Sequence, residues 1–123
     1  MCEAIRSRRI HTPQNADKTS ARWYEEANLS RSYFSEAFLY AADFTGADLS
    51  HADFNRTYAV EPSFERANLR SIFLNEASLD RANLRRADLS SGCLYRTSFR
   101  GSELQGATLA GADLSGAFFS AAT

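Results

Sequence analysis

Large apolar residues recur at every fifth position over most of this chain. From Leu29 to Phe119 the sequence places nineteen such centres at intervals of five, and eighteen of them are Leu or Phe, with Ala59 as the exception. Two residues before each centre stands a small residue, which is Ala at most positions and Ser, Thr or Gly at most others. The residue between the two is mostly polar, and the register does not slip.

A period of five fits neither an α-helix nor a flat strand. On an α-helix, steps of five would wind the large residues around the cylinder. On a strand, successive centres would alternate between the two sides, because the side-chain period is two. Within one repeat, however, the small residue and the centre are two apart and point the same way on a short extended segment. The other two residues turn a corner, so the pattern predicts a coiled β structure with apolar side chains directed inward from every side.

The charged residues indicate how many repeats make one turn of this coil. Residues one turn apart stack at ~4.8 Å, and like charges directly opposed are destabilising. A twenty-residue turn stacks six pairs of opposite charge against one like pair, Arg66–Arg86. A fifteen-residue turn instead stacks like charges, such as Glu61 on Glu76. The sequence therefore predicts four repeats per turn, with these opposite pairs: Glu36–Arg56, Arg56–Glu76, Glu76–Arg96, Glu61–Arg81, Glu65–Arg85 and Asp80–Arg100.

Segments such as ANLSR, ADLSH, ANLRR and ADLSG resemble the pentapeptide repeat family, whose pattern is a small residue, a polar one, Leu or Phe, and two variable positions. The resemblance covers residues 27–121. It implies an all-β fold, a right-handed quadrilateral β-helix of about nineteen repeats and nearly five coils. The sequence departs from the pattern at Ala59, Pro62 and Ile72. Because proline cannot donate to a sheet ladder, we expect a bulge or an altered corner around residues 59–64.

Residues 1–22 stand outside the repeat, and their polar, non-periodic sequence predicts a flexible N-terminal tail before a β-helix over residues 23–123. The tail lacks the apolar segment of a secretory signal, although its Arg and Ser content leaves an organellar transit peptide open. No stretch is long and apolar enough to cross a bilayer. Cys2 and Cys93 lie far apart and form neither a metal motif nor a disulfide framework, so we expect reduced thiols in a cytoplasmic protein.

The composition favours a binding protein over an enzyme. Fourteen basic and fifteen acidic residues leave a net charge of −1, which disfavours nucleic acid and anionic membranes as partners. We expect no cofactor, no metal and no catalytic residue, because His11 and His51 lack partners at a ligand spacing and Cys93 has no histidine one turn away. The aspartates that precede centres are expected to hydrogen-bond within their own turns. They are Asp43, Asp48, Asp53, Asp88 and Asp113.

One candidate interaction patch follows from the twenty-residue turn. Phe38 then stacks on Tyr58, and Tyr40 stacks on Val60, which places a contiguous apolar patch on an otherwise polar rod. Such a patch is either an interface or a surface that the same chain covers. We expect either a protein partner at this patch or the N-terminal segment folded over it.

The two ends of the coil are candidate contact sites as well, because each end leaves unpaired backbone groups. Trp23 and Tyr24 are placed to cover the first coil. The alternative is that they fold back over the apolar patch. Phe118 and Phe119 lie in the last coil with no charged residue after them. We therefore expect a homodimer through end-to-end contact of the C-terminal coil.

The function expected from these features is a non-enzymatic protein-interaction scaffold whose partner the sequence does not identify. It would use the apolar patch or an arginine-rich corner formed by Arg66, Arg81, Arg85, Arg86, Arg96 and Arg100. The alternative comes from the family resemblance, since some pentapeptide repeat proteins mimic duplex DNA and protect a type II topoisomerase (gyrase) from inhibitors. Those members are longer, acidic and dimerise through a C-terminal module, whereas this chain is short and neutral. Direct nucleic-acid binding is a third hypothesis, disfavoured because most of the arginines face acidic neighbours.

Overall fold

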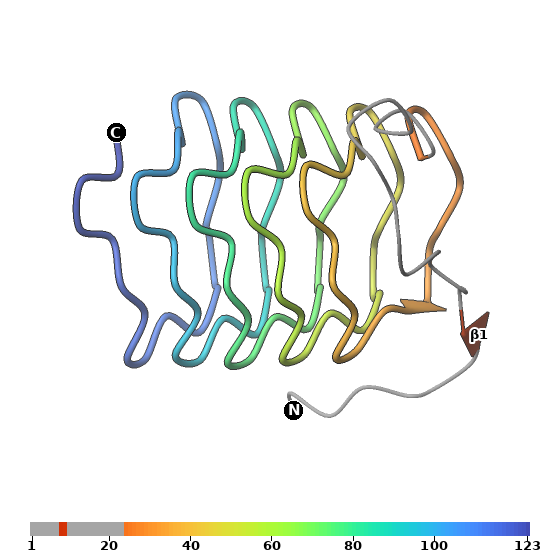
Figure 1. The fold of residues 1–123 in the computed structure, drawn as a ribbon, viewed down its shortest axis with the longest axis horizontal. Helices are drawn as coiled ribbons and strands as arrows, with labels where there is room; N and C mark the ends of the chain where they lie inside the picture. Colours follow the sequence, from red (N-terminus) through yellow and green to blue (C-terminus); the bar gives the residue numbers. More distant parts are fainter. Residues whose placement is uncertain (1–7, 10–23) are drawn as a thin grey trace.

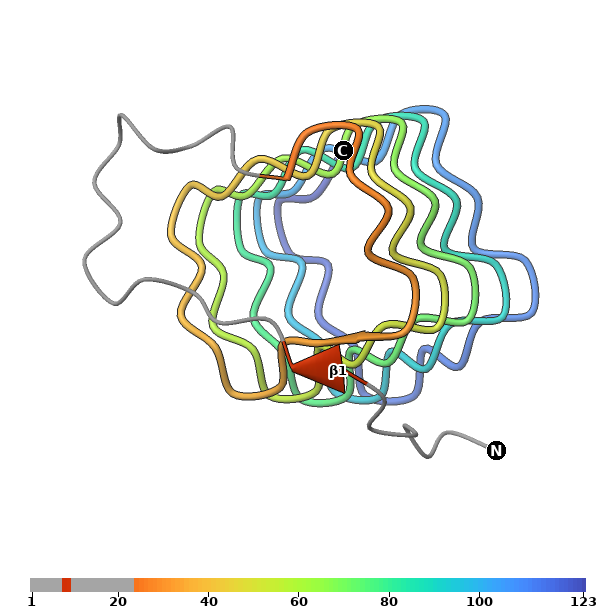
Figure 2. The ribbon, with the colours of Figure 1, turned by 90° about the vertical axis from the view of Figure 1, so that its right-hand side faces the viewer.

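The chain winds into a stack of similar coils (Figure 1), in a computed structural model that describes Arg8–Arg9 and residues 24–123. Parallel bridges join residues twenty apart without a break, from Asn28–Asp48 to Ser98–Phe118. Viewed along the stack, each coil has a four-sided outline (Figure 2). The predicted turn of four repeats is therefore confirmed.

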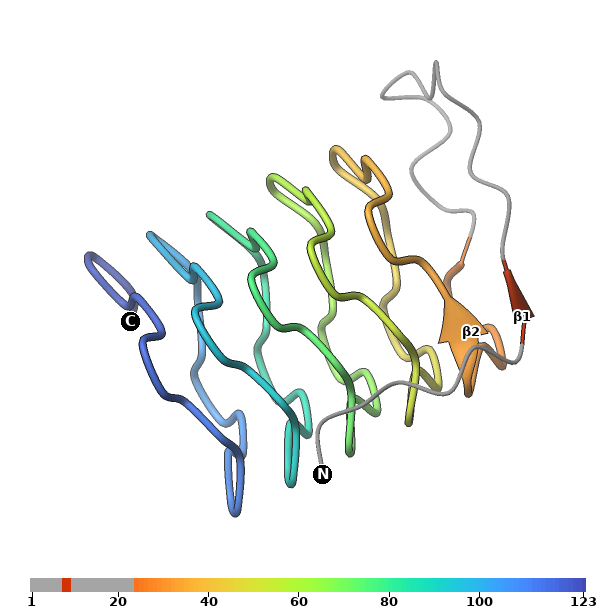
Figure 3. The same ribbon diagram turned by 90° about the horizontal axis from the view of Figure 1, so that it is seen from below.

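Two short strands are present at the N-terminal end of the stack, where they lie side by side (Figure 3). They are β1 (Arg8–Arg9) and β2 (Ser32–Tyr33), and they pair in parallel with Arg8 opposite Ser32 and Arg9 opposite Tyr33. Within the tail over residues 1–22, the structure describes only β1. The expectation that this tail is flexible therefore stays a prediction. Among the described residues, no helix has the length and hydrophobicity needed to span a bilayer.

Each coil has four sides, called here faces I to IV in chain order and identified by their centres. The centres of face I are Leu29, Leu49, Leu69, Leu89 and Leu109; those of face II are Phe34, Phe54, Leu74, Leu94 and Leu114; those of face III are Leu39, Ala59, Leu79, Phe99 and Phe119; and those of face IV are Phe44, Phe64, Leu84 and Leu104. In every repeat we call the small residue two before the centre the inner residue, and the residue two after it the corner residue.

The centres form one continuous core along the axis of the stack. Every centre from Phe34 to Phe99 is at most 2% exposed, including Ala59. Aromatic centres stack on those one coil away, with Phe44 and Phe64 centroids 5.1 Å apart and their planes 3° from parallel. Because burying a Leu or Phe side chain stabilises a fold by roughly 1.5–3 kcal/mol, this column is the main stabilising feature.

Tyr24 adds one more centre to the N-terminal end of face IV. Its ring stacks on Phe44 at 4.9 Å, nearly parallel, and meets Phe34 edge-on at 5.6 Å. Burial raises the pKa of the Tyr24 phenol above its ordinary value. The prediction that Tyr24 covers the first coil is confirmed, while Trp23 lies outside the described residues.

Backbone hydrogen bonds divide into a ladder between coils and turns within them. In the ladder, the N–H of Leu49 donates to Asn68 O (2.8 Å), and the N–H of Asn68 donates back to Ala47 O (2.9 Å). The N–H of the inner residue stays within its coil, as Ala52 shows by donating to Leu49 O (3.0 Å). All corner residues have positive φ, between 53° and 75°. A non-glycine residue in this region costs roughly 1–2 kcal/mol, which explains why glycine recurs at corners.

The repeat that contains Pro62 keeps its contacts with the neighbouring coils, so the bulge expected at residues 59–64 is wrong, whereas the corner is altered: residues 60–61 form a bend where the other described corners form turns. Ser63 forms parallel bridges with both Asp43 and Asn83, and the N–H of Asn83 donates to Pro62 O at 2.9 Å. Pro62 occupies an inner position, where the N–H serves the corner turn and not the ladder. Proline therefore removes one turn hydrogen bond and leaves the contact between coils intact.

Cys93 occupies the outward position before the centre Leu94 on face II, and it is disulfide-bonded. The expectation of two reduced thiols is therefore wrong. Cys2 lies outside the described residues.

Candidate interaction surfaces

The predicted apolar patch lies on face III, near the N-terminal end of the stack. Phe38 and Tyr58 are paired by a parallel bridge, and their ring centroids are 6.1 Å apart with the planes inclined at 54°. The exposed fractions are 79% for Phe38, 57% for Tyr58 and 48% for Tyr40, whereas Val60 is half-buried. The structure therefore brings all four residues to one face, as predicted.

The backbone holds this patch rigidly. The N–H of Tyr58 donates to Ala37 O, the N–H of Leu39 donates to Tyr58 O, and the N–H of Ala41 donates to Val60 O, each at 2.9 Å. These bonds fix the outward residues of two successive coils at one spacing. The side chains are consequently presented from a fixed platform rather than from a loop.

One of the alternatives for this patch is wrong. Tyr24 packs into the core against Phe44 and does not cover face III. Trp23 and most of the N-terminal segment lie outside the described residues. Whether a protein partner uses the patch stays a prediction.

The C-terminal coil has half-buried apolar side chains where the earlier coils are fully buried. The centres Leu104, Leu109, Leu114 and Phe119 are all partly exposed, and Phe118 is 52% exposed. Phe119 stacks on Phe99 at 5.0 Å, so its inner side is packed. Arg100 lies over the Phe118 ring at 6.0 Å. The two residues named as an end-to-end contact thus lie at one end of face III, and their role stays a prediction.

The predicted charge pairs form in part. Glu36 pairs with Arg56 at 3.0 Å and Glu61 with Arg81 at 3.4 Å. Arg85 instead binds Glu103, at 2.9 Å, and not the Glu65 expected from direct stacking. The ladder register is right, but diagonal neighbours on the next coil compete for each long side chain. The pairs are exposed, so each contributes about 0–1 kcal/mol.

The arginine-rich corner is not one continuous surface. Arg81 and Arg85 are ion-paired, and Arg96 lies over the Tyr95 ring at 5.5 Å. Arg66 and Arg86 are exposed and stack at one corner, and neither forms an ion pair with any residue in the described part of the chain. Two isolated like charges make a weak anchor for nucleic acid, whose affinity depends on many phosphate contacts.

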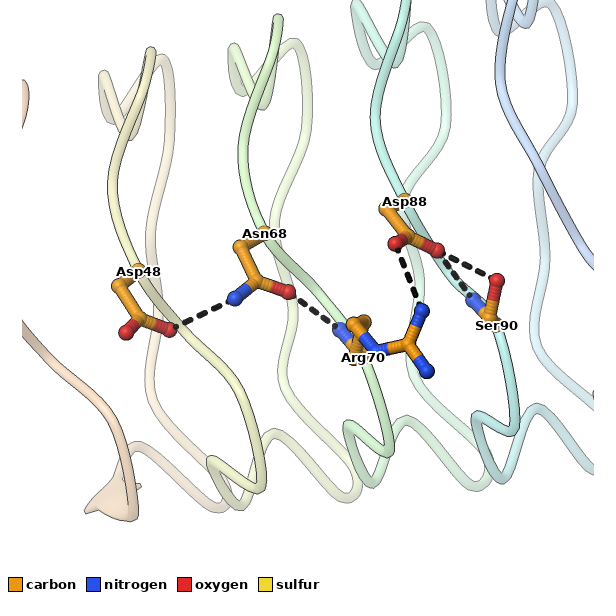
Figure 4. Close-up of polar contacts among 5 residues, drawn as sticks. All are labelled: Asp48, Asn68, Arg70, Asp88 and Ser90. Atoms are coloured by element: carbon orange, nitrogen blue, oxygen red, sulfur yellow. Dashed lines mark hydrogen bonds and ion pairs between the residues drawn. The ribbon is translucent and has the colours of Figure 1, made fainter.

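A polar ladder runs along face I and was not predicted (Figure 4). The side-chain amide of Asn68 donates to Asp48 Oδ1 at 3.2 Å across one coil, and its Oδ1 accepts the N–H of Arg70 at 3.1 Å. Arg70 reaches the next coil and binds Asp88 Oδ2 at 3.2 Å. The other oxygen of Asp88 accepts both the hydroxyl and the N–H of Ser90. The sequence signal was present, since Asp or Asn recurs before the first four centres of this face.

The Asp88 carboxylate is stabilised in its ionised form. The hydroxyl of Ser90 is the largest cause that lowers the pKa of Asp88, and the Ser90 N–H and Arg70 add to it, while partial burial opposes them. Ser115 acts on Asp113 in the same way and lowers the pKa of that carboxyl too. These contacts satisfy the carboxylates within their own turns and with the next coil.

The predicted role of the outward aspartates in their own turns is confirmed. Each of Asp43, Asp48, Asp53, Asp88 and Asp113 accepts a hydrogen bond from the N–H two residues ahead, at 2.9 to 3.0 Å. Among the described residues, no group of three His, Cys, Asp or Glu side chains could hold a metal ion. His51 is an exposed corner residue, and His11 lies outside the described part of the chain.

A sequence profile described as Pentapeptide repeats matches residues 25–58, 63–101 and 102–123, in eight copies. No curated protein matches the sequence significantly.

Solved structures similar to this chain carry the same repeat. A pentapeptide repeat protein from the thylakoid lumen of Arabidopsis thaliana is 27% identical, with a TM-score of 0.46 over 83% of this chain and 69% of that one. HetL from the cyanobacterium Nostoc, a pentapeptide repeat protein involved in heterocyst differentiation regulation, is 26% identical, with a TM-score of 0.39 over 76% of this chain and 58% of that one.

A trypsin-treated variant of QnrB1, a plasmid-mediated fluoroquinolone resistance protein, is 24% identical, with a TM-score of 0.39 over 80% of this chain and 58% of that one. This chain thus spans 58% of the length of both HetL and QnrB1. TM-scores this low support no inference about function.

Proposed function

Because the chain belongs to the pentapeptide repeat family, we propose that it is a non-enzymatic scaffold that binds a protein partner through the apolar patch on face III. The family fold is a right-handed quadrilateral β-helix, and we propose nearly five coils of it here. The observation that carries the function is Phe38, which is 79% exposed beside the exposed ring of Tyr58. Adjacent exposed aromatic residues on a rigid surface are typical of binding sites.

The chemistry of the patch defines the partner surface that would fit it. Phe38 and Val60 supply apolar area, while the hydroxyls of Tyr40 and Tyr58 supply polar edges. Glu61 is the corner residue that follows Val60, and it forms an ion pair with Arg81 of the next coil. A matching partner would offer an apolar pocket with hydrogen-bond acceptors at its rim. Because the patch is built on a fixed ladder, little ordering entropy is lost when it binds.

Affinity purification from cells of the source organism tests this proposal. The bait proteins are the unmodified chain, the double variant Phe38→Ser/Tyr58→Ser, and a matched control, Tyr95→Ser, which removes an aromatic residue 42% exposed on another face. Thermal unfolding of all three establishes that each is folded. A partner recovered with the unmodified chain and the Tyr95→Ser control, but lost with the double variant, is expected.

Two outcomes would refute the proposal that the patch is the binding surface. If the same proteins are recovered with all three baits, or if the control loses them as the double variant does, the binding surface lies elsewhere on the rod.

The topoisomerase alternative receives less support from the molecule. A DNA mimic needs a run of negative charge, whereas this chain carries a net charge of −1 and Asp88 on face I is ion-paired with Arg70. A gyrase supercoiling assay distinguishes the two functions. Protection of gyrase from a fluoroquinolone at micromolar protein would favour the alternative and displace the general scaffold proposal.

We also propose a homodimer formed by contact between two C-terminal coils. The half-buried centres Leu104, Leu109 and Leu114, together with Phe118 and Phe119, would be covered in such a dimer. Multi-angle light scattering at micromolar concentration is expected to give twice the monomer mass. A monomer mass across that range would eliminate the dimer without affecting the patch.

The cytoplasmic location expected from the sequence stays a prediction. The disulfide at Cys93 is the feature that opposes it, because cytosolic reductants keep most protein thiols reduced.

A further inference from the structure

Charged residues line both edges of face III, and their signs reverse at the same level of the stack. At the edge before the outward residues, the corner residues of four successive coils alternate in charge: Glu36, Arg56, Glu76 and Arg96. At the opposite edge, the corner residues change from Glu61 to Arg81 between the same two middle coils. All six side chains are exposed. Turning the face end over end about that level therefore exchanges acidic and basic positions at both edges.

We infer that face III binds a second copy of this chain, with the two rods side by side and antiparallel. The second copy is then the partner of the apolar patch, so the inference rests on the proposed function. The two-fold axis crosses the face between the coils of Tyr58 and Ser78, and a two-fold axis makes an interface self-complementary. Opposite charges of the two copies then face each other at three positions: Glu36 and Arg96, Arg56 and Glu76, and Glu61 and Arg81.

Glu76 and Arg96 are the two charges of this set that form no ion pair with any residue in the described part of the chain. Arg96 lies over the Tyr95 ring, and Arg56 binds Glu36 at 3.0 Å rather than Glu76. In the dimer, Glu76 would meet Arg56 of the second copy, which extends the pair Glu36–Arg56 into a network of both chains. Complementary charges across an interface suppress wrong arrangements and fix its register.

The outward side chains along the middle of face III fit the same arrangement. In chain order they are Phe38, Tyr58, Ser78, Ser98 and Phe118. The two-fold axis places Phe38 opposite Ser98 of the second copy, and Tyr58 opposite Ser78. Packed sheets lie about 10 Å apart, so a ring that faces a serine fills this space, whereas two serines that face each other leave it empty. The dimer would thus cover the rings of Phe38 and Tyr58, which are 79% and 57% exposed in the single chain.

A parallel arrangement of the two rods is disfavoured by charge. A two-fold axis along the rods would exchange the two edges of the face at each level. Glu76 would then lie opposite Asp80 of the second copy, and Arg96 opposite Arg100, and like charges directly opposed are destabilising. In the antiparallel arrangement Asp80 faces Val60 instead, and its carboxylate keeps the hydrogen bond that it accepts from the Arg100 N–H at 3.3 Å.

The contact between the two copies is short. Four coils at ~4.8 Å make it about 19 Å long, so the buried area falls at the low end of protein interfaces, where complexes are reversible. The dimer is therefore expected to dissociate on dilution. It uses a different surface from the proposed dimer of C-terminal coils, and substitutions at Glu76 distinguish the two.

Sedimentation equilibrium of the full chain over a concentration series tests the second copy as partner. Glu76→Arg places two arginines opposite each other, while the exchange Arg56→Glu/Glu76→Arg restores opposite charges across the dimer. Glu65→Arg, the same change on face IV, is the matched control, and urea unfolding establishes that every variant is folded. The dissociation constant is expected to rise about tenfold or more for Glu76→Arg. It is expected to stay close to that of the unmodified chain for the exchange and for the control.

Three results would overturn the inference. They are a monomer at every concentration, a dimer whose dissociation constant does not respond to Glu76→Arg, and a weakened dimer that the exchange does not restore. The proposed function survives each of these results if affinity purification still loses its partner with Phe38→Ser/Tyr58→Ser. Recovery of the same proteins with that double variant would instead remove the proposed function.

Discussion

Ile72 lies directly one coil before Gly92 on the inner column of face II, with its Cγ2 3.6 Å from the place that a Cβ on Gly92 would occupy. Ile72 is the largest inner residue of this column and is fully buried. At that distance the added Cβ would be in ordinary van der Waals contact with Ile72, and its tighter contacts would be Leu89 O at 3.1 Å and Leu94 Cδ2 at 3.4 Å. The largest inner residue of this column thus packs directly against its smallest.

This relationship predicts energetic coupling between the two positions. Gly92→Val should lower the free energy of unfolding by about 1–3 kcal/mol through overpacking, and Ile72→Ala by about 2–5 kcal/mol through a cavity. The double variant should lose less than the sum, with a coupling of about 0.5–3 kcal/mol. Urea unfolding of the three variants measures this, and strict additivity would show that the pair does not share one space.

Corner residues predict a second pair of variants. Ser91 has a φ of 60° and Gly111, one coil later at the same corner, has a φ of 71°. Ser91→Gly should raise the free energy of unfolding by up to about 1 kcal/mol, because strain is relieved. Gly111→Ala should lower the free energy of unfolding by about 1 kcal/mol, because of the positive φ alone: the added Cβ would make only ordinary contacts, with Ser91 Oγ at 3.6 Å and Ser91 N at 3.9 Å. Two changes of the same sign in thermal unfolding would contradict this account.

Ser32 carries a buried hydroxyl that finds no hydrogen-bond partner among the described residues. Equivalent inner hydroxyls are satisfied, as in Thr97, whose Oγ1 donates to Leu74 O at 2.7 Å. Ser32→Ala should therefore stabilise the fold by about 1–3 kcal/mol, while Thr97→Val, the matched control, should destabilise it by about 1 kcal/mol. Denaturant unfolding decides the point, and a destabilised Ser32→Ala protein would mean that the hydroxyl has a partner.

The lowered pKa of Asp88 predicts a pH dependence in the acid range. Because the folded-state pKa lies below the ordinary value of 3.8, the ionised carboxylate stabilises the fold above that value. This contribution is lost as the pH falls through the folded-state pKa. Asp88→Asn should remove that part of the pH dependence, which unfolding measured at several pH values below neutrality would detect.

Ser90 offers a control for the cause of this shift. Ser90→Ala should raise the pKa of Asp88 towards 3.8, whereas Ser115→Ala should act on Asp113 alone. An NMR titration of the carboxyl carbons separates the two, and an unchanged Asp88 in Ser90→Ala would exclude the hydroxyl as the main cause.

The sequence predicts the coil and most of the core because the repeat states them directly. Phe44 occupies the same position of the repeat as the other centres, so it points inward as they do. The stacking of opposite charges predicted a turn of twenty residues, which the bridges confirm. The patch at Phe38 and Tyr58 follows from that turn alone. These features depend on the five-residue period, which can be read directly from the sequence.

Other features depend on contacts that periodicity does not describe. Proline at position 62 is tolerated because an inner N–H belongs to the turn, which only the hydrogen-bond pattern reveals. Arg85 selects Glu103 over Glu65 through its side-chain conformation. The bond at Cys93 is a contact that the five-residue period does not describe.

The central functional claim is that the exposed rings of Phe38 and Tyr58 carry the binding energy for a protein partner. Isothermal titration calorimetry of the purified partner against the unmodified chain and against Phe38→Ala/Tyr58→Ala tests it most directly. The account predicts that the double variant, still folded, loses at least about 2 kcal/mol of binding free energy, which is roughly a thirtyfold rise in Kd. An unchanged Kd would contradict it.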